Sequence, residues 1–298
     1  MATLRDIKRR INAVANTSKI TQAMRMVSAA KLRRAQEAIW SARPYVQKLN
    51  QILINLIENV GEDYSHPLIQ KRKSINNIAL IAVATDRGLC GSFNTNLFRY
   101  VTNYVKNDLH NDYPNANLHF VSVGKRSCNF FRKEYKNILK EFPNVFQSLQ
   151  FTTAKDIVNT VADKFMDGKI DMVIVFYNEF KNLISQVPRH QVVLPIDPRI
   201  STKEKTQDKY QLDYIFEPDK KLILDELLPK NLDIQIWRAL LESNAAEQAA
   251  RMVAMENATN NAYDLIKHLE LVYNKERQAS ITKEMLEIVS GANALKKS

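Results

Sequence analysis

Glycine is nearly absent from both ends of the chain, and this absence constrains the fold more than any other feature of the sequence. The 298-residue sequence contains six glycines, and all but Gly291 lie within 61–168. Glycine and proline are the residues that most often interrupt helices and strands. Residues 1–60 and 219–298 are therefore each predicted to form a long helix. Residues 61–218 are predicted to form a folded domain with turns.

The N-terminal segment carries apolar residues at alternating three- and four-residue spacing, which is typical of a coiled coil. Thr3 and Asp6 form a capping-box pattern that predicts the start of the helix. We expect the polar stretch Asn16–Lys19 to break the apolar seam and Pro44 to bend the helix. The seam consists of Leu4, Ile7, Ile11 and Val14, then of Ile20, Met24 and Val27, and from Ala35 of Ile39, Ala42, Val46, Leu49, Leu53, Leu56 and Val60.

The C-terminal segment repeats this spacing over a stretch without glycine or proline, Asn231–Ile288. Its small alanine side chains allow a second helix to approach closely. Two long helices with similar seams at opposite ends of one chain are predicted to pair with each other, antiparallel. The C-terminal seam consists of Leu241, Ala245, Ala249 and Met252, and then of Ala258, Ala262, Leu265, Leu269 and Val272.

The middle of the chain alternates strand and helix patterns, which predicts a mainly parallel α/β sheet. The polar stretch Ser201–Gln211 is expected to be an exposed loop. The predicted helices are Asn96–Leu109, Lys125–Tyr135 and Ala154–Met166, and the predicted strands are Ile78–Ala84, Leu118–Val123 and Met172–Tyr177, with shorter β segments at Ile184–Val187, His190–Leu194 and Tyr214–Phe216.

The surplus of positive charge lies on the N-terminal segment. The whole chain has a formal net charge of +11, and residues 1–60 hold 11 basic and 3 acidic residues. Such a segment binds nucleic acid or an anionic membrane, forms a solvated helix face, or lies inside an acidic protein cavity. Apolar residues such as Met24 lie among the charges, and no aromatic residue precedes Trp40. This pattern favours a protein partner over single-stranded nucleic acid.

The turn Thr85–Asn94 is the sharpest local cluster, because it follows a predicted strand and precedes a predicted helix. Phosphates often bind at such positions in α/β folds. However, Gly88-x-x-Gly91 is only a fragment of a phosphate-loop motif. The residues therefore favour a tight strand-to-helix turn over a nucleotide site. The core of this turn is Asp86, Arg87, Gly88, Leu89, Cys90 and Gly91.

The two cysteines, Cys90 and Cys128, are too few for a disulfide scaffold and fit a reducing compartment. Cys90 at a helix start has the environment of a nucleophile, but no histidine spacing ties a base to it, so a buried thiol is the favoured interpretation. The sequence has no metal-ligand motif and no apolar run near the ~20 residues of a membrane span. Its first residues do not form a secretory signal.

Polar residues lie close to the C-terminal seam, and composition leaves their role open. They pair within the helix for a few tenths of a kcal/mol, or they bind loops of a partner. The residues concerned are Glu247, Arg251, Glu256, Arg277 and Gln278. Two broader alternatives also stay open. One is an α/β enzyme with Asp86 and Cys90 in its site, and the other is a nucleic-acid-binding coiled coil.

Four blocks of sequence stand out along the chain. They are Lys8–Arg33 with its core Asn16–Thr21 and Ala23–Val27, Asp86–Gly91, Glu247–Met255, and Arg277–Glu284 continued by Glu287, Ser290, Gly291 and Ala292. Taken in order, these blocks resemble the gamma subunit of F-type rotary ATP synthase, and the resemblance covers the whole chain.

The resemblance implies a long antiparallel coiled coil of the N- and C-terminal helices plus a central Rossmann-like α/β domain. The helices would form a rotor shaft within a hexameric head of alpha and beta subunits. The central domain would lie against the epsilon subunit and the c-subunit ring. The nucleotide sites would belong to the beta subunits, so this chain is expected to need no cofactor. It would be a non-catalytic subunit that couples proton flow to ATP synthesis or hydrolysis and regulates both.

The resemblance also implies roles for individual residues. Met24 would lie near the moving lever of a beta subunit, and Arg251, Arg277 and Gln278 would contact beta-subunit loops. The cysteine pair of chloroplast relatives is expected to be absent, because no cysteine follows Cys128. No transit peptide is visible, so we expect a peripheral subunit on the cytoplasmic face of a bacterial plasma membrane.

Overall fold

The computed structural model divides into two compact units. The helix-pair unit comprises residues 1–28 and 251–298, and the sheet unit comprises residues 29–250. Two predicted segments lie wholly or mostly outside the described residues. These are the loop Ser201–Gln211 and the β segment Tyr214–Phe216, of which only Phe216 is described. The structure describes residues 3–60, 64, 66–70, 72, 74–196, 216–217 and 219–296, with only the backbone at 58, 59 and 293–296.

The sheet unit contains a five-stranded sheet in the order β3-β2-β1-β4-β5. The strands β1, β2, β3 and β4 are parallel, and β5 pairs with β4 in the antiparallel direction. The predicted mainly parallel sheet is therefore confirmed. The strands are β1 (Asn77–Val83), β2 (Asn117–Val123), β3 (Ile138–Phe142), β4 (Met172–Phe180) and β5 (Gln186–Leu194).

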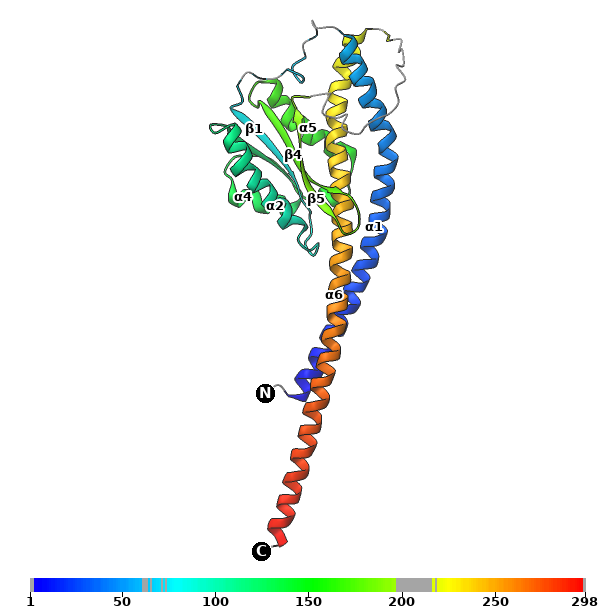
Figure 1. The fold of residues 1–298 in the computed structure, drawn as a ribbon, viewed down its shortest axis with the longest axis vertical. Helices are drawn as coiled ribbons and strands as arrows, with labels where there is room; N and C mark the ends of the chain where they lie inside the picture. Colours follow the sequence, from blue (N-terminus) through cyan, green and yellow to red (C-terminus); the bar gives the residue numbers. More distant parts are fainter. Residues whose placement is uncertain are drawn as a thin grey trace. The chain divides into compact units, whose positions relative to one another are not determined.

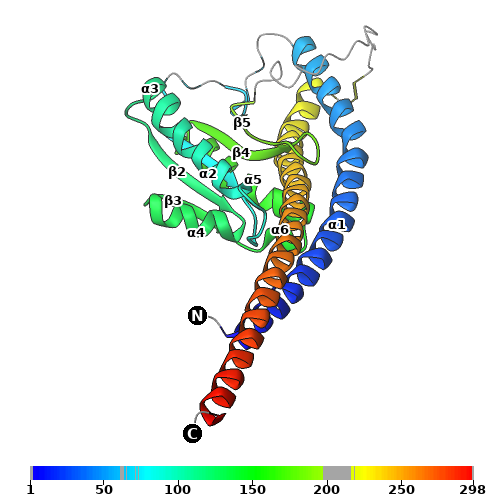
Figure 2. The same cartoon turned by 60° about the horizontal axis from the view of Figure 1, so that its bottom comes forward.

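The structure corrects the predicted set of strands at two places. The strand β3 was not predicted, because Ile138–Phe142 is short and carries two charged residues; it pairs with β2 at an edge of the sheet. Figure 2 shows it beside α4 (Lys125–Glu134). Gln186 and Val187 of the first predicted segment and all of 190–194 belong to one strand, β5, which runs through Pro188, whereas Ile184 and Ser185 precede the strand. A proline lacks an N–H donor but is tolerated on an edge strand such as β5.

Helices cover both faces of the sheet, as Figure 1 shows. The helices α2 and α4 cover one face, and α5 covers the other together with parts of the two long helices. Successive residues of β1 enter opposite cores because side chains alternate across a strand. Ala79, Ile81 and Val83 join one core and Ile78, Leu80 and Ala82 the other. The helices are α2 (Phe93–Tyr104), continued by a π-helical turn η1 (Val105–Leu109) and α3 (His110–Asp112), then α4, a 3-10 turn η2 (Val145–Gln147) and α5 (Phe151–Met166).

The two long helices are α1 (Leu4–Asn59) and α6 (Lys220–Lys296). The predicted cap of α1 is confirmed, since the amide of Asp6 donates to Thr3 Oγ1 at 3.3 Å and the amide of Thr3 donates to Asp6 Oδ2 at 3.2 Å. The helix α1 continues through Pro44, and α6 continues through Pro229.

The helix-pair unit contains the first part of α1 packed antiparallel on the last part of α6. Thr21 contacts Thr259 and Arg25 contacts Glu256, so the residue number rises along one helix as it falls along the other. The predicted antiparallel pairing is therefore confirmed.

The predicted break of the N-terminal seam is wrong. The seam passes without interruption through Ser18, Thr21 and Ser28, which are buried, whereas Ile20 and Val27 are 61% and 56% exposed. The polar residues are tolerated because Ser and Thr are small and because the Thr21 hydroxyl lies within hydrogen-bonding distance of Ser18 O. Hydrophobicity alone therefore placed the seam on the wrong side of α1 in this stretch.

The C-terminal seam is confirmed only in part. Ala262 and Leu269 are buried as predicted, but Leu265 is exposed, and Met255 and Thr259 take the buried positions. In the sheet unit the seam of α1 follows the prediction closely. Every predicted position from Ala35 to Val60 is buried or half-buried. Among them, the buried positions are Ala35, Leu49, Leu53 and Leu56.

Candidate partner-binding surfaces

The predicted functional residues fall into two groups, one in each unit. Asp86–Gly91 lies in the sheet unit, between β1 and α2. Met24, Arg251, Arg277 and Gln278 lie in the helix-pair unit.

Asp86 is an internal hydrogen-bond acceptor at the carboxyl end of β1. Its Oδ1 accepts the backbone N–H groups of Lys125 at 2.9 Å and Asn144 at 2.8 Å, and its Oδ2 accepts that of Phe146 at 2.7 Å. The side chain thus ties the end of β1 to the start of α4 and to the turn after β3. A phosphate would bind to N–H groups at such a helix start. Here the chain's own carboxylate accepts them.

The rest of the turn is also bonded internally. The Thr85 hydroxyl donates to the carbonyl of Arg87 at 2.7 Å, and Asn94 Nδ2 donates to Thr85 Oγ1 at 2.8 Å. Leu89 adopts a φ of 63° and is 65% exposed, and Gly91 adopts a φ of 60°. These bonds and dihedral angles support the predicted tight strand-to-helix turn rather than a nucleotide site.

Gly124, which precedes α4 opposite this turn, shows how closely the segments approach. Its φ is +88°, and a Cβ atom there would lie 2.0 Å from the carbonyl oxygen of Ala84. Only glycine fits this position. The signal was present in the sequence as a glycine directly after a strand, but its partner Ala84 is forty residues away.

Both thiols are buried. Cys90 is 3% exposed, accepts a hydrogen bond from Asn94 Nδ2 at 3.3 Å and packs with Phe93 and Ala246. Burial raises the pKa of the Cys128 thiol to about 11. The environment of Cys90 is that of a packed side chain, which supports the favoured interpretation over a nucleophile.

Arg25 and Glu256 form an ion pair between the two helices of the helix-pair unit, with Arg25 Nη1 3.3 Å from Glu256 Oε1. Both side chains are about half exposed, so the pair contributes at most about 1 kcal/mol. Glu256 therefore pairs with the other helix of its own chain. The sequence had suggested pairing within α6 or binding to a partner loop. Met24, next to Arg25, is half-buried.

The other residues predicted to contact a partner differ in accessibility. Arg251 is only 8% exposed and Glu247 only 4%, so most of each side chain is covered by this chain. Arg277 and Gln278 are exposed on α6. These two residues therefore offer a larger contact surface to a partner than Arg251 does.

The end of α6 extends beyond its partner helix within the helix-pair unit, as Figure 1 shows. Seventeen residues separate Thr21 from Leu4, and the same step forward from Thr259 reaches Glu276. The residues of α6 after this point have no counterpart on α1. They extend for roughly 30 Å at about 1.5 Å per residue.

This lone end of α6 exposes large apolar side chains, which the sequence reasoning missed. Ile281, Met285, Ile288 and Val289 follow one another at spacings of four, three and one residues, which places these four on one side of the helix. Exposed apolar stripes of this kind mark surfaces that bind a partner. The side chains are Ile281, Met285, Leu286, Ile288 and Val289, and each is at least 49% exposed.

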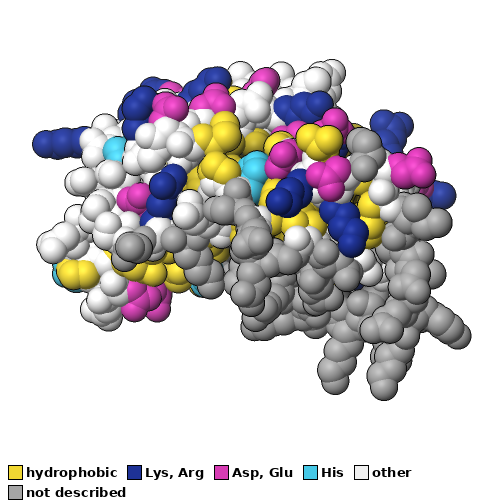
Figure 3. Space-filling view, turned by 90° about the horizontal axis from the view of Figure 1, so that it is seen from above, with side chains coloured by type: hydrophobic (Ala, Val, Ile, Leu, Met, Phe, Trp, Pro, Cys, Tyr) yellow, Lys and Arg dark blue, Asp and Glu magenta, His cyan; other side chains and the backbone are white. Residues whose placement is uncertain are grey.

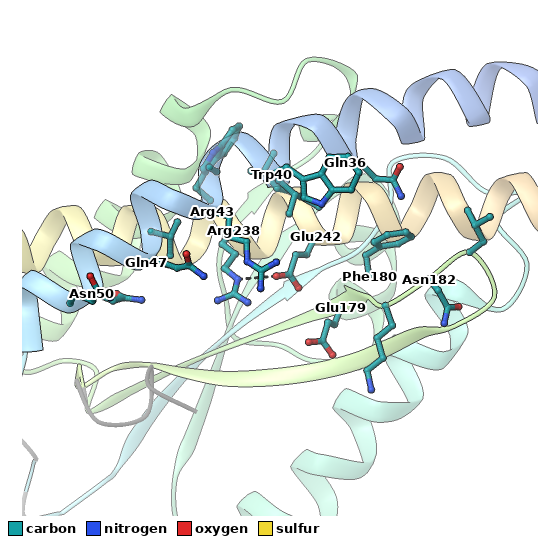
Figure 4. A pocket seen from close by; sticks show the side chains of 18 of the residues that line it. Gln36, Trp40, Arg43, Gln47, Asn50, Glu179, Phe180, Asn182, Arg238 and Glu242 are labelled. Atoms are coloured by element: carbon teal, nitrogen blue, oxygen red, sulfur yellow. Dashed lines mark hydrogen bonds and ion pairs between the residues drawn. The ribbon is translucent and has the colours of Figure 1, made fainter. Parts of the chain in front are cut away.

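A cleft of about 850 Å³ opens in the sheet unit between α1, α6 and the β4–β5 hairpin. Figure 4 shows Trp40, Gln47 and Asn50 of α1 on one side and Glu179 and Asn182 of the hairpin on the other. Arg238 and Glu242 of α6 form an ion pair at 2.9 Å in its wall. The lining mixes apolar, amide and paired charged groups.

The visible face of the molecule in Figure 3 carries cationic and acidic side chains interspersed with apolar ones. That face does not gather the single sign of charge typical of a nucleic-acid surface. Among the described residues, no group of three or more His, Cys, Asp or Glu side chains is placed to hold a metal ion. In the same part of the chain, no helix is both long and apolar enough to cross a membrane.

Comparison with known sequences places the whole chain in one family. The model of the ATP synthase family matches residues 3–295. The chain is 46% identical to the ATP synthase gamma chain of Chlorobium phaeobacteroides (strain DSM 266) over 296 residues, which is 99% of this chain and 100% of the relative. It is 45% identical to the ATP synthase gamma chain of Chloroherpeton thalassium over 304 residues, covering all of both chains.

Solved structures share the fold. The mitochondrial ATP synthase central stalk and c-ring of Tetrahymena thermophila contains a chain with a TM-score of 0.57 and 26% identity, and the match covers 80% of this chain and 99% of that one. A chain of the Euglena gracilis mitochondrial ATP synthase rotor has a TM-score of 0.64 and 19% identity, covering 93% and 98%, and shows the fold alone. The resemblance of the four sequence blocks is confirmed, and the chain belongs to the ATP synthase gamma chain family.

Proposed function

We propose that the chain is the central rotor shaft of an F-type ATP synthase. As a shaft it couples transmembrane proton flow to ATP synthesis or hydrolysis at the beta subunits, and it regulates both. The observation that carries the proposal is the lone end of α6, where a helix with five exposed large apolar side chains extends past the first residue of α1 and packs on no other described helix of its unit. Exposed apolar side chains of this kind are buried when a partner protein surrounds the helix end.

The partners that we propose are the alpha and beta subunits of the head, the epsilon subunit and the c-subunit ring. The titles of the matched solved structures name a central stalk with a c-ring in Tetrahymena and a rotor in Euglena. In this assembly residues 1–60 and 219–298 would form the shaft, and residues 61–218 would form the domain at its foot. The chain would be peripheral, on the cytoplasmic face of a bacterial plasma membrane.

The contacts with the beta subunits would involve the predicted residues of the helix-pair unit. Arg277 and Gln278 lie at the start of the lone end of α6, where their exposed side chains offer hydrogen-bond donors to a loop. Met24 would contribute a half-buried apolar contact. Arg251 would act mainly by supporting the helix pair, because its side chain is largely covered. Asp86–Gly91 would belong to the foot, with Arg87, Leu89 and Gly91 as its exposed members.

The mechanism that follows is mechanical and requires no catalytic residue in this chain. An asymmetric shaft presents a different side to each catalytic site of the head. Each orientation makes differential contacts with the conformations of a beta subunit, and rotation therefore shifts their populations. The internally bonded turn at Asp86 supports this non-catalytic role. The backbone N–H groups that could bind a nucleotide phosphate there donate to the Asp86 carboxylate instead.

Two measurements test the proposal. The tagged full-length chain, purified from its own cells, should bring down alpha, beta and epsilon subunits with ATPase activity. The isolated chain should show no saturable ATP binding in isothermal titration calorimetry and no ATP hydrolysis. Saturable nucleotide binding by the isolated chain, or purification without the other subunits, would contradict the proposal and favour the enzyme alternative.

A further inference from the structure

Two alanine pairs on α6 receive different neighbours in the sheet unit. Ala245 and Ala249 pack with Leu32 and Ala35 of α1. The second pair, Ala246 and Ala250, packs with the turn and helix start that contain Cys90 and Phe93. Ala245, Ala246 and Ala249 are fully buried. One turn and a half of α6 is thus enclosed between α1 and the end of the sheet.

Phe180, the last residue of β4, belongs to both contacts. Its side chain packs against the cluster with Leu32 and Ala245 and also against the cluster with Cys90 and Ala246. Figure 4 shows it on the β4–β5 hairpin, beside the two long helices. Relative movement of α6 against either neighbour therefore disturbs the packing of the same phenyl ring.

The chemistry of these side chains favours a rigid contact. Alanine has no side-chain rotamers, so its contacts loosen only if the backbone moves. Phenylalanine buries a large area with few rotatable bonds. A longer residue in place of alanine would overpack the site, at a cost of about 1–3 kcal/mol.

The position of this contact on α6 gives it mechanical importance. The sheet unit also packs on α6 through a broad apolar core that includes Leu224, Leu228, Leu232, Ile236 and Leu240. The contact at 245–250 lies at the end of the unit, whose boundary is Ala250. It therefore involves the part of α6 that lies next to this boundary.

We infer that Phe180, Cys90 and Phe93, seated on the alanines at 245, 246, 249 and 250, form a rigid joint that transmits torque from the sheet to α6. We name this set the Phe180 joint. The inference rests on the proposed rotor function and deepens it, because it adds a specific contact to the broad apolar core through which the sheet packs on α6. It also gives Cys90 a role as a packing residue of the joint. A joint of this kind stays closed throughout rotation.

The first experiment locks the joint with a disulfide. Ala246→Cys adds a second thiol to the buried cluster that contains native Cys90, and mild oxidation of the assembled complex should join the two thiols, as thiol counting after denaturation would show. A joint that stays closed should leave ATP hydrolysis and proton pumping in membrane vesicles unchanged by the lock. The control is Ala246→Cys combined with Cys90→Ala, in which oxidation should form no such bond. Loss of turnover that dithiothreitol reverses would overturn the inference, and so would failure of the disulfide to form.

The second experiment loosens the joint. Phe180→Ala should lower the protons pumped per ATP hydrolysed by about twofold or more, because the cavity lets the sheet move against α6 without turning it. Phe180→Leu should restore most of the ratio. The matched control is Phe130→Ala, which removes a half-buried ring that stacks on Phe98 in the other core.

The readouts separate this inference from the proposed function. Co-purification of the Phe180→Ala chain with alpha and beta subunits shows that the rotor assembles, whatever the pumping ratio. An assembled Phe180→Ala enzyme with the same ratio as the Phe130→Ala enzyme would overturn the joint while leaving the rotor function intact. If Phe180→Ala does not assemble, the disulfide experiment decides.

Discussion

The hydroxyl oxygens of Thr21 and Thr259 lie 2.7 Å apart, buried between α1 and α6 in the helix-pair unit. Thr21 Oγ1 is also 3.0 Å from the carbonyl of Ser18, and Thr259 Oγ1 is 2.8 Å from that of Met255. Each hydroxyl has a single proton. One hydroxyl therefore donates to the other across the interface, and the acceptor donates to a carbonyl of its own helix.

This pairing predicts non-additive effects of removing the two hydroxyls. Thr21→Val or Thr259→Val alone should destabilise the helix pair by about 1 kcal/mol, because each loses the shared hydrogen bond. The double variant should cost no more than either single one, which gives a coupling of about 1 kcal/mol. Native-state hydrogen exchange of amides near Thr259 measures these costs. Thr17→Val, at an exposed threonine, is the control, and additive effects of the two changes would refute the pairing.

Asp86 is predicted to be essential for the sheet unit rather than for chemistry. Asp86→Ala leaves three backbone N–H groups without their acceptor, and we expect a loss of about 3–5 kcal/mol. Asp86→Asn keeps one acceptor oxygen and should cost less. Urea denaturation followed by near-UV circular dichroism measures both. The control is Asp167→Ala, because the exposed ion pair of Asp167 with Lys169 is worth only about 0–1 kcal/mol. Equal costs at 86 and 167 would contradict the bonding described.

The stability of the sheet unit is predicted to fall in mild acid. Burial lowers the pKa of His66, His119 and His190 below their ordinary value of 6.5. The unfolded chain therefore binds these protons first, so that stability is full above that value and is lost as the pH falls toward the folded pKa. We expect a lower free energy of unfolding at pH ~5.5 than at pH ~7.5.

His190 provides the test of this pH dependence, because its Nδ1 lies 2.7 Å from the Tyr100 hydroxyl and its ring lies 4.3 Å from that of Tyr104. His190→Phe keeps the aromatic packing and removes the titrating group, so it should flatten the dependence. The same change at exposed His268 should not. A pH profile that is unchanged in His190→Phe would show that burial of this imidazole does not cause the loss.

Arg277 is predicted to act on a partner and not on the fold. Arg277→Ala should lower ATP turnover of the assembled enzyme about tenfold, equivalent to ~1.4 kcal/mol. Thermal unfolding of the isolated chain should not change, because the side chain is exposed. Lys275→Ala, a neighbouring exposed cation, is the control for general loss of charge. Unchanged synthesis and hydrolysis in Arg277→Ala would remove this residue from the proposed contact surface.

The long helices and the type of sheet were predictable because they depend on local composition and periodicity. A segment without glycine and with one proline propagates as a helix, and α1 indeed continues through Pro44. The apolar run at Ile78–Ala84 specifies a strand that is buried on both faces. The four sequence blocks were sufficient to predict the family.

The correct seam and the charge contacts were not predictable in the same way. Ser18 and Thr21 are buried because a second helix approaches closely enough to cover them, whereas their own polarity predicts exposure. The partner of Glu256 is Arg25, which lies 231 residues away. A pattern along one helix states which residues share a face, but it does not state which polar groups a second helix will satisfy.

The character of the turn at Asp86–Gly91 was decided only by the tertiary structure. The sequence determined that a turn joins a strand to a helix there, because glycines at 88 and 91 follow an apolar run. Whether that turn binds a phosphate or closes on itself depends on Lys125, Asn144 and Phe146, which the sheet brings to Asp86 from 39 to 60 residues away. Backbone N–H groups carry no signature in a sequence, and only the fold determines which acceptor they meet.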